Sequence, residues 1–316
     1  MNETLAENKK IKIVSVIGPT ASGKTKLAVD ICKAIGGEVV SCDSMQIYKY
    51  MDIATAKPTK EEMQGIPHHM MDFVEPTEKY SVAAYLDEAR KTIEDIAARS
   101  KIPVLTGGTG LYYSSLVDNV KFFEEDPDTT IRDNLKLRLE QEGAQKLLNE
   151  LNEIDPQTAE MLHPNNTGRI IRALELYYKR GITMTEQKRQ SKLEGEIYDC
   201  KAIGLDARDR QYLYSRINRR VDMMVEAGLI DEARKFLNDN LGKTSAQAIG
   251  YKELIPYFNN EISLEAALDN LKMETRRYAK RQLTWFRKDK RINWLYIDES
   301  SYEQILQEAL RIVEEG

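Results

Sequence analysis

The feature that most constrains this chain is an eight-residue loop between a strand-like segment and a helical one. Residues 11–17 read IKIVSVI, a β-branched and apolar run that predicts a buried parallel strand. GPTASGKT follows at residues 18–25 and matches the pattern G-x-x-x-x-G-K-[ST]. A helix is expected next, over about 24–35, and Gly36-Gly37 ends it. This order of strand, loop and helix predicts a phosphate-binding loop (P-loop).

The P-loop residues are suited to holding a polyphosphate. Its glycines let the backbone wrap tightly, so that amide groups point at anionic oxygens with help from the helix dipole. Lys24 is expected to reach the terminal phosphate, and Thr25 to offer its hydroxyl to Mg²⁺. The predicted phosphate-binding residues are Gly18, Pro19, Thr20, Ala21, Ser22, Gly23, Lys24 and Thr25.

The remaining pattern extends this loop into an α/β fold. Strand-like segments return at 38–42, 102–105, 200–206 and 293–297, with a further apolar run at 68–74. Helices are expected after the N-cap Ser81 and over 301–314. Strands that alternate with helices predict a doubly wound parallel sheet. Between residues 118 and 199 the pattern is mostly helical, so we expect a P-loop core, 1–117 with 200–316, and a helical insertion, 118–199.

Composition excludes several classes of protein. A net charge of −5 excludes a uniformly basic nucleic-acid binder but allows local basic faces. No segment approaches the ~20 apolar residues that span a bilayer, and the polar start MNETLAENKK has no apolar leader core. Cys32, Cys42 and Cys200 form no CxxC pair, which favours a reducing, cytoplasmic setting over a disulfide framework or a zinc ribbon. Adjacent His68 and His69 are poorly spaced for one metal ion.

An acidic residue follows the second strand. P-loop kinases and ATPases normally have an acid at the end of an apolar strand that helps to hold Mg²⁺. The strand at 102–105 is followed by TGGTG instead, so the sequence offers only Asp43 in such a position near the P-loop. Asp43 is either a general base, or a Mg²⁺ ligand or N-cap without that role. The nearby Gln46 carries an amide of the type that pairs with adenine.

The glycine-rich segment TGGTG at 106–110 has two interpretations. Its glycines allow either a close backbone approach to a ligand or only a tight turn between strand and helix. In the first case the Thr109 hydroxyl lies in a cleft.

Two basic segments are also ambiguous. Residues 270–291 contain nine Lys or Arg against two acids, with three aromatics interleaved. They either contact a phosphate backbone or form a solvated helix with an aromatic core stripe. Arg216 and Arg220 share a helical face, so they either clamp one phosphate or pair with surface acids.

Taken together, eight stretches resemble the tRNA dimethylallyltransferase family, also called isopentenyl-diphosphate:tRNA transferases. They keep that family's order from residue 11 to about 291: GPTASGKT, DSMQIYKYMDIATAKP, HHMMDFVEP, YSVAAY, GGTGLY, GRIIRALE, QAIGYKE and RRYAKRQLTWFR. The resemblance implies a P-loop kinase-like core with a helical insertion domain that contacts tRNA. It also implies transfer of a dimethylallyl group from dimethylallyl diphosphate to N6 of adenosine 37, beside the anticodon. The implied partners are the anticodon stem-loop and the diphosphate donor, with Mg²⁺, in a monomer that needs no membrane.

The resemblance assigns roles to residues. Lys24, Asp43 and Thr109 are implied to be catalytic, with Asp43 taking the amine proton, while Arg216 and Arg220 join the P-loop as candidate diphosphate ligands. The residues implied to contact tRNA are Asp43, Ser44, Met45, Gln46, Thr109, Arg132, Gly168, Arg169, Ile170, Ile171, Arg172, Gln247, Ala248, Ile249, Gly250, Tyr251 and Lys252.

Two rival functions use the same P-loop. A small-molecule or nucleoside kinase would transfer a phosphoryl group from ATP, and a non-catalytic RNA-binding protein would use the loop as a nucleotide switch. The lack of a second acidic residue and the DSMQ segment at 43–46 argue against the kinase. The sequence leaves open whether ATP also binds the P-loop.

Overall fold

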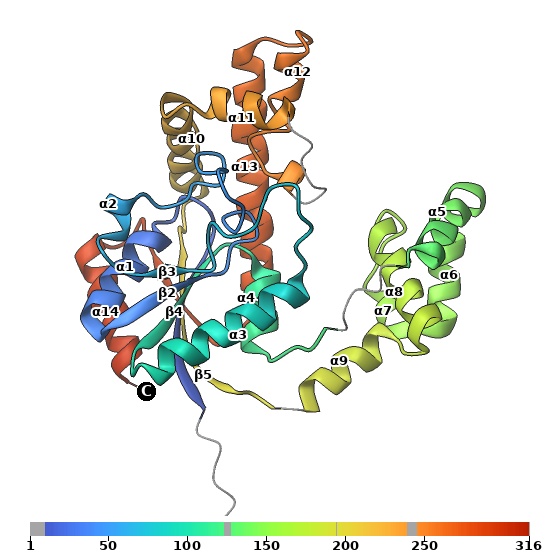
Figure 1. Cartoon of the computed structure of the whole chain (residues 1–316), viewed down its shortest axis with the longest axis horizontal. Helices are drawn as coiled ribbons and strands as arrows, with labels where there is room; N and C mark the ends of the chain where they lie inside the picture. The colour runs from blue at the N-terminus through green and yellow to red at the C-terminus, as the bar shows by residue number, and fades with distance from the viewer. Residues whose placement is uncertain (1–9, 123–127, 194, 239–244, 316) are drawn as a thin grey trace, which may run out of the picture. The chain divides into compact units, whose positions relative to one another are not determined.

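The computed structural model describes residues 10–122, 128–193, 195–238 and 245–315. These residues form two compact units (Figure 1). The first unit, called the core, contains the described residues up to Val117 and from Ile197 onward. The second, called the helical unit, contains those between Asp118 and Glu196.

The core is built on one sheet of six strands, and every pairing in it is parallel. The strand order is β3-β2-β4-β1-β5-β6, which confirms the predicted doubly wound parallel sheet. Central β1 is buried on both faces from Ile13 to Ile17, as its mostly apolar and β-branched sequence predicts. The strands are β1 Ile11–Ile17, β2 Gly37–Ser41, β3 His68–His69, β4 Ile102–Gly107, β5 Tyr198–Asp206 and β6 Ile292–Tyr296.

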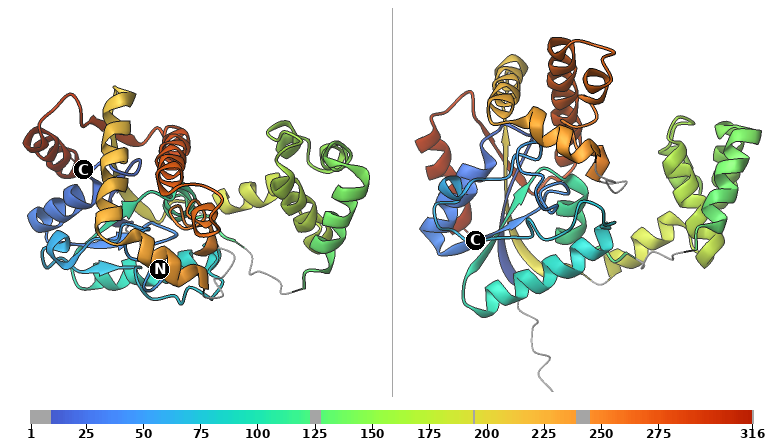
Figure 2. Two further views of the ribbon diagram at one scale, coloured as in Figure 1. Left: turned by 90° about the horizontal axis from the view of Figure 1, so that it is seen from above. Right: turned by 45° about the horizontal axis from the view of Figure 1, so that its top comes forward.

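Helices cover both faces of the sheet (Figures 1 and 2). On one face, α1 (Lys24–Ile35) and α14 (Tyr302–Glu314) pack against apolar side chains of the central strands. On the other face lie α3 (Val82–Ala98) and α4 (Gly110–Val117), joined by a stacked pair of tyrosines, Tyr85 and Tyr112, with ring centroids 3.9 Å apart. The P-loop therefore opens at the carboxyl edge of a fully covered sheet.

A second group of core helices lies beyond that carboxyl edge. Its members are α2 Lys60–Met63, α10 Arg210–Glu226, α11 Leu229–Asn238, the 3₁₀ turn Ser245–Gln247, α12 Ile255–Phe258 and α13 Leu264–Phe286. Helices α11 and α13 share a hydrophobic cluster with the segment after β2, to which Ile47, Tyr48 and Met51 contribute fully buried side chains. This packing ties the segment 43–58 to the second half of the chain.

The helical unit contains α5 Thr130–Glu142, α6 Ala144–Ile154, α7 Pro156–Glu160, α8 Thr167–Arg180 and α9 Met184–Leu193. Its core comes from apolar residues at helical spacing, including Leu135, Leu151 and Leu174. Asp155 caps α7 through the Thr158 amide and also accepts hydrogen bonds from Thr185 at the start of α9. Gly181 ends α8 in the left-handed conformation that glycine adopts at many helix C-termini.

The structure extends some predicted elements. The strand expected at 102–105 continues to Gly107, because its last two residues still pair with β1. The strand expected at 200–206 begins at Tyr198. Within the described part of the chain, no helix is both long and apolar enough to cross a membrane.

Candidate active site at the phosphate-binding loop

The P-loop leads from β1 into α1. Gly18 has a φ of +145°, and a Cβ there would lie 2.4 Å from the Leu205 carbonyl oxygen of β5, so only glycine fits. Gly23 precedes α1 and offers no side-chain cap to its first amides. The Ser22 hydroxyl is buried without a hydrogen-bond partner among the described residues. The loop thus presents several unsatisfied donors, as an anion site requires.

Lys24 lies inside this loop. Its Nζ donates a hydrogen bond of 2.7 Å to the Pro19 carbonyl oxygen. Burial and the nearby charge of Arg220 lower the pKa of Lys24 to about 7, against the opposing effect of Asp43. The lysine therefore lies near the cation Arg220 and the acid Asp43, and a bound anion would favour its charged form.

Arg216 and Arg220 project from α10 toward the same loop. Arg216 Nε donates to the Ala21 carbonyl oxygen at 2.8 Å, within the P-loop. Arg220 donates to the Ala56 carbonyl oxygen at 3.5 Å, and burial lowers its pKa despite the attraction of Glu62 and Asp43. The structure thus brings both predicted arginines to the P-loop, where neutral carbonyl groups orient them.

Asp43 follows β2 and faces these cations. Its Oδ1 accepts a hydrogen bond from the backbone amide of Met45 at 2.9 Å, and the backbone amide of Gln46 also donates to this carboxylate. Burial raises the pKa of Asp43, although these hydrogen bonds and the charges of Lys24 and Arg220 oppose the rise. No helix follows Asp43, so it caps a turn rather than a helix. A raised pKa brings a carboxylate closer to the range useful for a general base at neutral pH.

The glycine-rich segment packs closely against its own protein. A Cβ on Gly107 would lie 2.4 Å from the Cys42 backbone, and one on Gly110 would lie 2.3 Å from Trp285. These contacts require glycine for internal packing, which favours the tight-turn interpretation for the backbone. Thr109 nevertheless reaches the site, since its Oγ1 accepts the Ser44 amide at 2.9 Å.

Gln282 is a site residue that the sequence interpretation missed. It is buried on α13, where its Nε2 donates to the Gly108 carbonyl oxygen at 3.0 Å. Its Oε1 accepts the Thr20 amide at 2.9 Å, so one side chain joins the P-loop to the glycine-rich segment. On the same helix, Tyr278 is hydrogen-bonded to Thr109 and Gln282. The basic segment 270–291 therefore also supplies two polar residues to the site.

Gln46 makes its hydrogen bonds within the protein. Its Nε2 donates to the carbonyl oxygens of Thr55 and Ala56 at 3.3 and 3.1 Å, and its Oε1 accepts the Ser41 hydroxyl at 3.2 Å. A base that paired with this amide would have to replace these contacts.

The expectation that Asp43 alone occupies a strand end near the P-loop is wrong. β5 is hydrogen-bonded to β1 and ends at Asp206, the residue after the carbonyl that contacts Gly18. Asp206 is buried and forms ion pairs with Arg210 at 2.8 Å and Arg287 at 2.6 Å. It was missed because the order of strands in the sheet decides which strand ends adjoin the P-loop.

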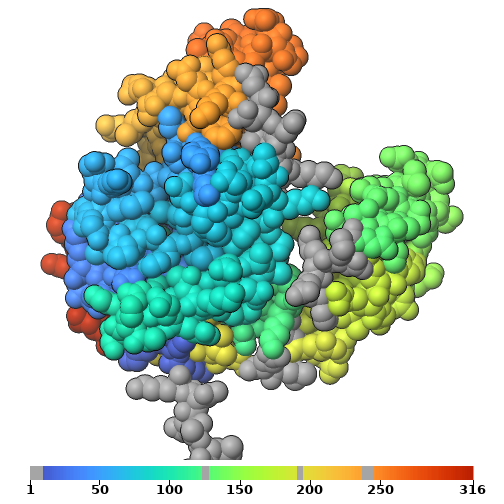
Figure 3. Space-filling model, viewed as in Figure 1, coloured from blue at the N-terminus to red at the C-terminus, as the bar shows by residue number. Residues whose placement is uncertain are grey.

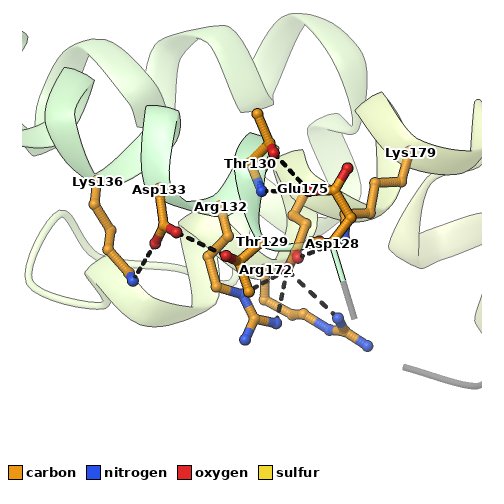
Figure 4. Close-up of polar contacts among 9 residues, drawn as sticks. All are labelled: Asp128, Thr129, Thr130, Arg132, Asp133, Lys136, Arg172, Glu175 and Lys179. Carbon is orange, nitrogen blue, oxygen red and sulfur yellow. Dashed lines mark hydrogen bonds and ion pairs between the residues drawn. The ribbon is translucent and has the colours of Figure 1, made fainter. Parts of the chain in front are cut away.

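In the helical unit, two of the predicted RNA-contacting residues, Arg132 and Arg172, lie around a buried carboxylate (Figure 4). Glu175 on α8 is bonded by Arg132 of α5 at 2.8 Å and lies 3.5 Å from both Arg172 and Lys179. Burial opposes ionisation of Glu175, but the Arg132 hydrogen bond and the surrounding cations lower its pKa. Arg132 and Arg172 extend to the same side of the helices and remain partly exposed.

The remaining predicted contacts divide by exposure. Gly168 and Arg169 are exposed at the start of α8, whereas Ile170 and Ile171 are buried in the core of the helical unit. Along residues 247–252, the exposed side chains are those of Gln247 and Lys252. Ala248, Gly250 and Tyr251 are buried, and Ile249 packs against the core cluster of α11 and α13.

Comparisons with known proteins give a consistent result. The family model described as IPP transferase matches residues 46–289, and the model described as isopentenyl transferase matches residues 11–75. The tRNA dimethylallyltransferase of Caldanaerobacter subterraneus is 49% identical over 299 residues, covering 93% of this chain and 95% of the relative. That of Bacillus cereus is 45% identical over 313 residues, covering 98% and 96%.

Solved structures agree with the sequence relatives. The full-length tRNA isopentenylpyrophosphate transferase of Bacillus halodurans has a TM-score of 0.71 and 43% identity, covering 97% of this chain and 98% of that one. A eukaryotic dimethylallyltransferase acting on tRNA has a TM-score of 0.78 and 29% identity, covering 96% of this chain and 80% of that one.

Proposed function

The chain belongs to the tRNA dimethylallyltransferase family, and from this membership we propose how its residues act. It transfers the dimethylallyl group of dimethylallyl diphosphate to N6 of adenosine 37, next to the anticodon of tRNA, which gives N6-isopentenyladenosine. One observation carries the assignment of the site to this reaction: the Asp43 carboxylate, just after β2, lies close enough to Lys24 and Arg220 at the P-loop for their charges to act on it.

The P-loop holds the diphosphate and stabilises it as it leaves. As the bond between the allylic carbon and the diphosphate oxygen breaks, negative charge grows on the phosphate oxygens. The loop amides, the Ser22 hydroxyl, Lys24 and Arg220 are oriented before the reaction, so they stabilise this charge without reorganising. Arg216 supports the same loop through the Ala21 carbonyl.

Mg²⁺ fits this site as a companion of the diphosphate. Among the described residues, no group of three His, Cys, Asp or Glu side chains could hold a metal ion. Thr25 is partly exposed at the start of α1, so its hydroxyl would bind Mg²⁺ together with phosphate oxygens, an arrangement that Mg²⁺ favours. When bound, the ion would add to the stabilisation of charge on the leaving group.

The adenine amine is the nucleophile. Its N6 forms a bond to the allylic carbon while the diphosphate departs, and Asp43 accepts the proton that N6 loses. Ser44 and Thr109, bonded to each other, hold the segment that carries Asp43. A stacked adenine cannot reach such a centre, so the nucleotide is flipped out of the anticodon loop.

The exposed residues of the predicted RNA-binding set contact the anticodon stem-loop. In the helical unit these are the exposed Gly168 and Arg169 and the partly exposed Arg132 and Arg172, and in the core the exposed Gln247 and Lys252. The enzyme acts as a monomer in the cytoplasm, in keeping with three cysteines that stay free thiols.

The decisive experiment is incubation of the protein with labelled dimethylallyl diphosphate, Mg²⁺ and unmodified tRNA. Label on adenosine 37 is the expected result, and tRNA with adenosine 37 replaced by guanosine is the matched control. Absence of label, together with phosphoryl transfer from ATP to a small acceptor, would favour the rival kinase. Tight tRNA binding without any turnover would favour a non-catalytic RNA-binding protein.

A further inference from the structure

A carboxylate on α11 is fully occupied by hydrogen bonds from two distant segments. Glu232 Oε2 accepts the amides of Asp52 and Ile53 at 2.9 and 2.8 Å. Its Oε1 accepts the Ala54 amide at 2.9 Å and the Tyr251 hydroxyl at 2.8 Å. An ionised carboxylate offers about four lone-pair sites, so these four donors use its whole capacity.

The amides that Glu232 binds begin a tight turn. The Ala56 amide donates to the Ile53 carbonyl oxygen at 2.9 Å, and the Lys57 amide donates to that of Asp52 at 3.0 Å. Ala56 has a φ of +50°, a conformation that a residue with a Cβ adopts only when its surroundings enforce it. The carboxylate thus fixes three consecutive amides of a strained turn, which lies against α11 in the space-filling view (Figure 3).

The other end of this turn supports the candidate active site. The carbonyl oxygens of Thr55 and Ala56 both accept hydrogen bonds from the side-chain Nε2 of Gln46. The Ala56 carbonyl oxygen also accepts a hydrogen bond from the Arg220 guanidinium. Displacement of the turn would therefore move the Ala56 carbonyl oxygen that Arg220 donates to, and with it two of the three hydrogen-bond partners of the Gln46 side chain.

The hydrogen bonds of the Glu232 carboxylate are distinct from the apolar contacts that pack α11 against the core. Leu229, Ala233 and Phe236 bury α11 in the hydrophobic cluster. Glu232 lies on the same helix but directs its charge at backbone donors of another segment, to which a neutral apolar residue could not bond. Its interactions therefore do more than attach the helix.

We propose that Glu232 is a positioning residue for the transfer reaction: it clamps Asp52–Ala54 and thereby sets the places of Arg220 and Gln46. It touches neither substrate. This inference rests on the proposed function, since it assigns Arg220 to the diphosphate and Gln46 to the adenosine side of the site. It also explains why segments far apart in the sequence meet at one carboxylate.

The first test is the steady-state kinetics of Glu232→Ala and Glu232→Gln. Glu232→Ala removes every acceptor, and the resulting displacement should lower kcat/KM about 100-fold. We expect this loss to include higher KM values for both dimethylallyl diphosphate and tRNA. Glu232→Gln keeps one oxygen and should lose about tenfold. Asp231→Asn is the matched control, because it removes one exposed charge from the same helical turn and should leave the kinetics unchanged.

The second test separates positioning from simple destabilisation. If Glu232 acts through Arg220, Glu232→Ala should cost far less in an Arg220→Ala background than in the wild type, and the same holds with Gln46→Ala. Asp231→Asn should combine additively with both. Hydrogen exchange should accelerate at residues 52–56 in Glu232→Ala, with β1 and α1 unchanged.

Each outcome decides the inference. Wild-type kinetics of Glu232→Ala, or additive losses with both Arg220→Ala and Gln46→Ala, would overturn it. If Glu232→Ala does not fold, the same double-mutant comparisons with Arg220→Ala and Gln46→Ala are made with Glu232→Gln and are judged by the same criteria. Failure of the wild-type protein to transfer label would instead reject the proposed function, which is a separate result.

Discussion

The core and the helical unit each gather basic side chains, but they hold them by different means. In the core, Lys24, Arg216 and Arg220 donate to the carbonyl oxygens of Pro19, Ala21 and Ala56. In the helical unit, Arg132, Arg172 and Lys179 surround the buried carboxylate of Glu175.

The difference bears on what each group of cations can do. Carbonyl groups orient a cation but do not neutralise it, so these side chains remain available to pair with an incoming anion. Burial is the main cause that lowers the pKa values of Lys24 and Arg220, and repulsion from a neighbouring cation adds to it in each case. Glu175 neutralises one charge of its group and holds two partly exposed arginines, an arrangement suited to weaker contacts with a phosphate backbone.

The largest effect should come from removing the acid of the core. Asp43→Ala should lower single-turnover transfer by about 10²–10⁴-fold, because the amine proton loses its acceptor. Binding of tRNA should persist, as measured by filter retention. Near-normal transfer by this variant would remove Asp43 from the role of base.

Removing a core cation should weaken donor binding next. Arg220→Ala should raise the Kd for dimethylallyl diphosphate by about 10- to 100-fold, the range for a hydrogen bond between charged groups. Calorimetry measures this directly, with Arg219→Ala as the control because Arg219 is exposed on the same helix. If Arg220→Ala binds dimethylallyl diphosphate with the same Kd as the wild type, Arg220 is not part of the diphosphate site.

Proton uptake on donor binding tests the charge state of Lys24, another cation of the core. The pKa of Lys24 is about 7 in the free protein, so the side chain loses its charge as the pH rises through 7. A bound diphosphate favours the charged form, so binding at pH 8 should take up a proton, and affinity should fall up to about tenfold per pH unit. Calorimetry in two buffers of different ionisation heat measures the uptake.

The control for this experiment is Lys24→Met. It should bind the donor more weakly and without that uptake, which isolates any protonation of the diphosphate itself. Unchanged proton uptake in Lys24→Met would assign the titration to another group.

The smallest effect belongs to the helical unit. Arg132→Ala and Arg172→Ala should each reduce the slope of log affinity for tRNA against log salt by about one, while single-turnover transfer at saturating tRNA stays normal. Lys146→Ala removes an exposed charge from the same unit and serves as the comparison. A slope unchanged by either arginine variant would place the RNA elsewhere.

Local sequence patterns predicted much of the fold. The strand, loop and helix over residues 11–35 follow from adjacent residues, and the shared face of Arg216 and Arg220 follows from their spacing. The carboxyl edge where the site lies follows from the parallel alternation of strands and helices.

The residues that were missed depend on contacts across long stretches of chain. Gln282 bonds Thr20 from 262 residues away, and Glu232 bonds Ala54 from 178 residues away. The position of Asp206 beside the P-loop follows from the order of strands in the sheet. No local pattern in a single sequence encodes such pairings, so these roles emerged only from the structure.

The contact between α13 and the glycine-rich segment limits how this chain can be recombined with others. A Cβ on Gly108 would lie 2.1 Å from Gln282 Nε2, and one on Gly110 would overlap Trp285. Each glycine thus leaves the space that is filled by a side chain about 175 residues later in the sequence. A chimera that imports a foreign α13 must import its glycine-rich segment as well, because the two surfaces are complementary only as a pair.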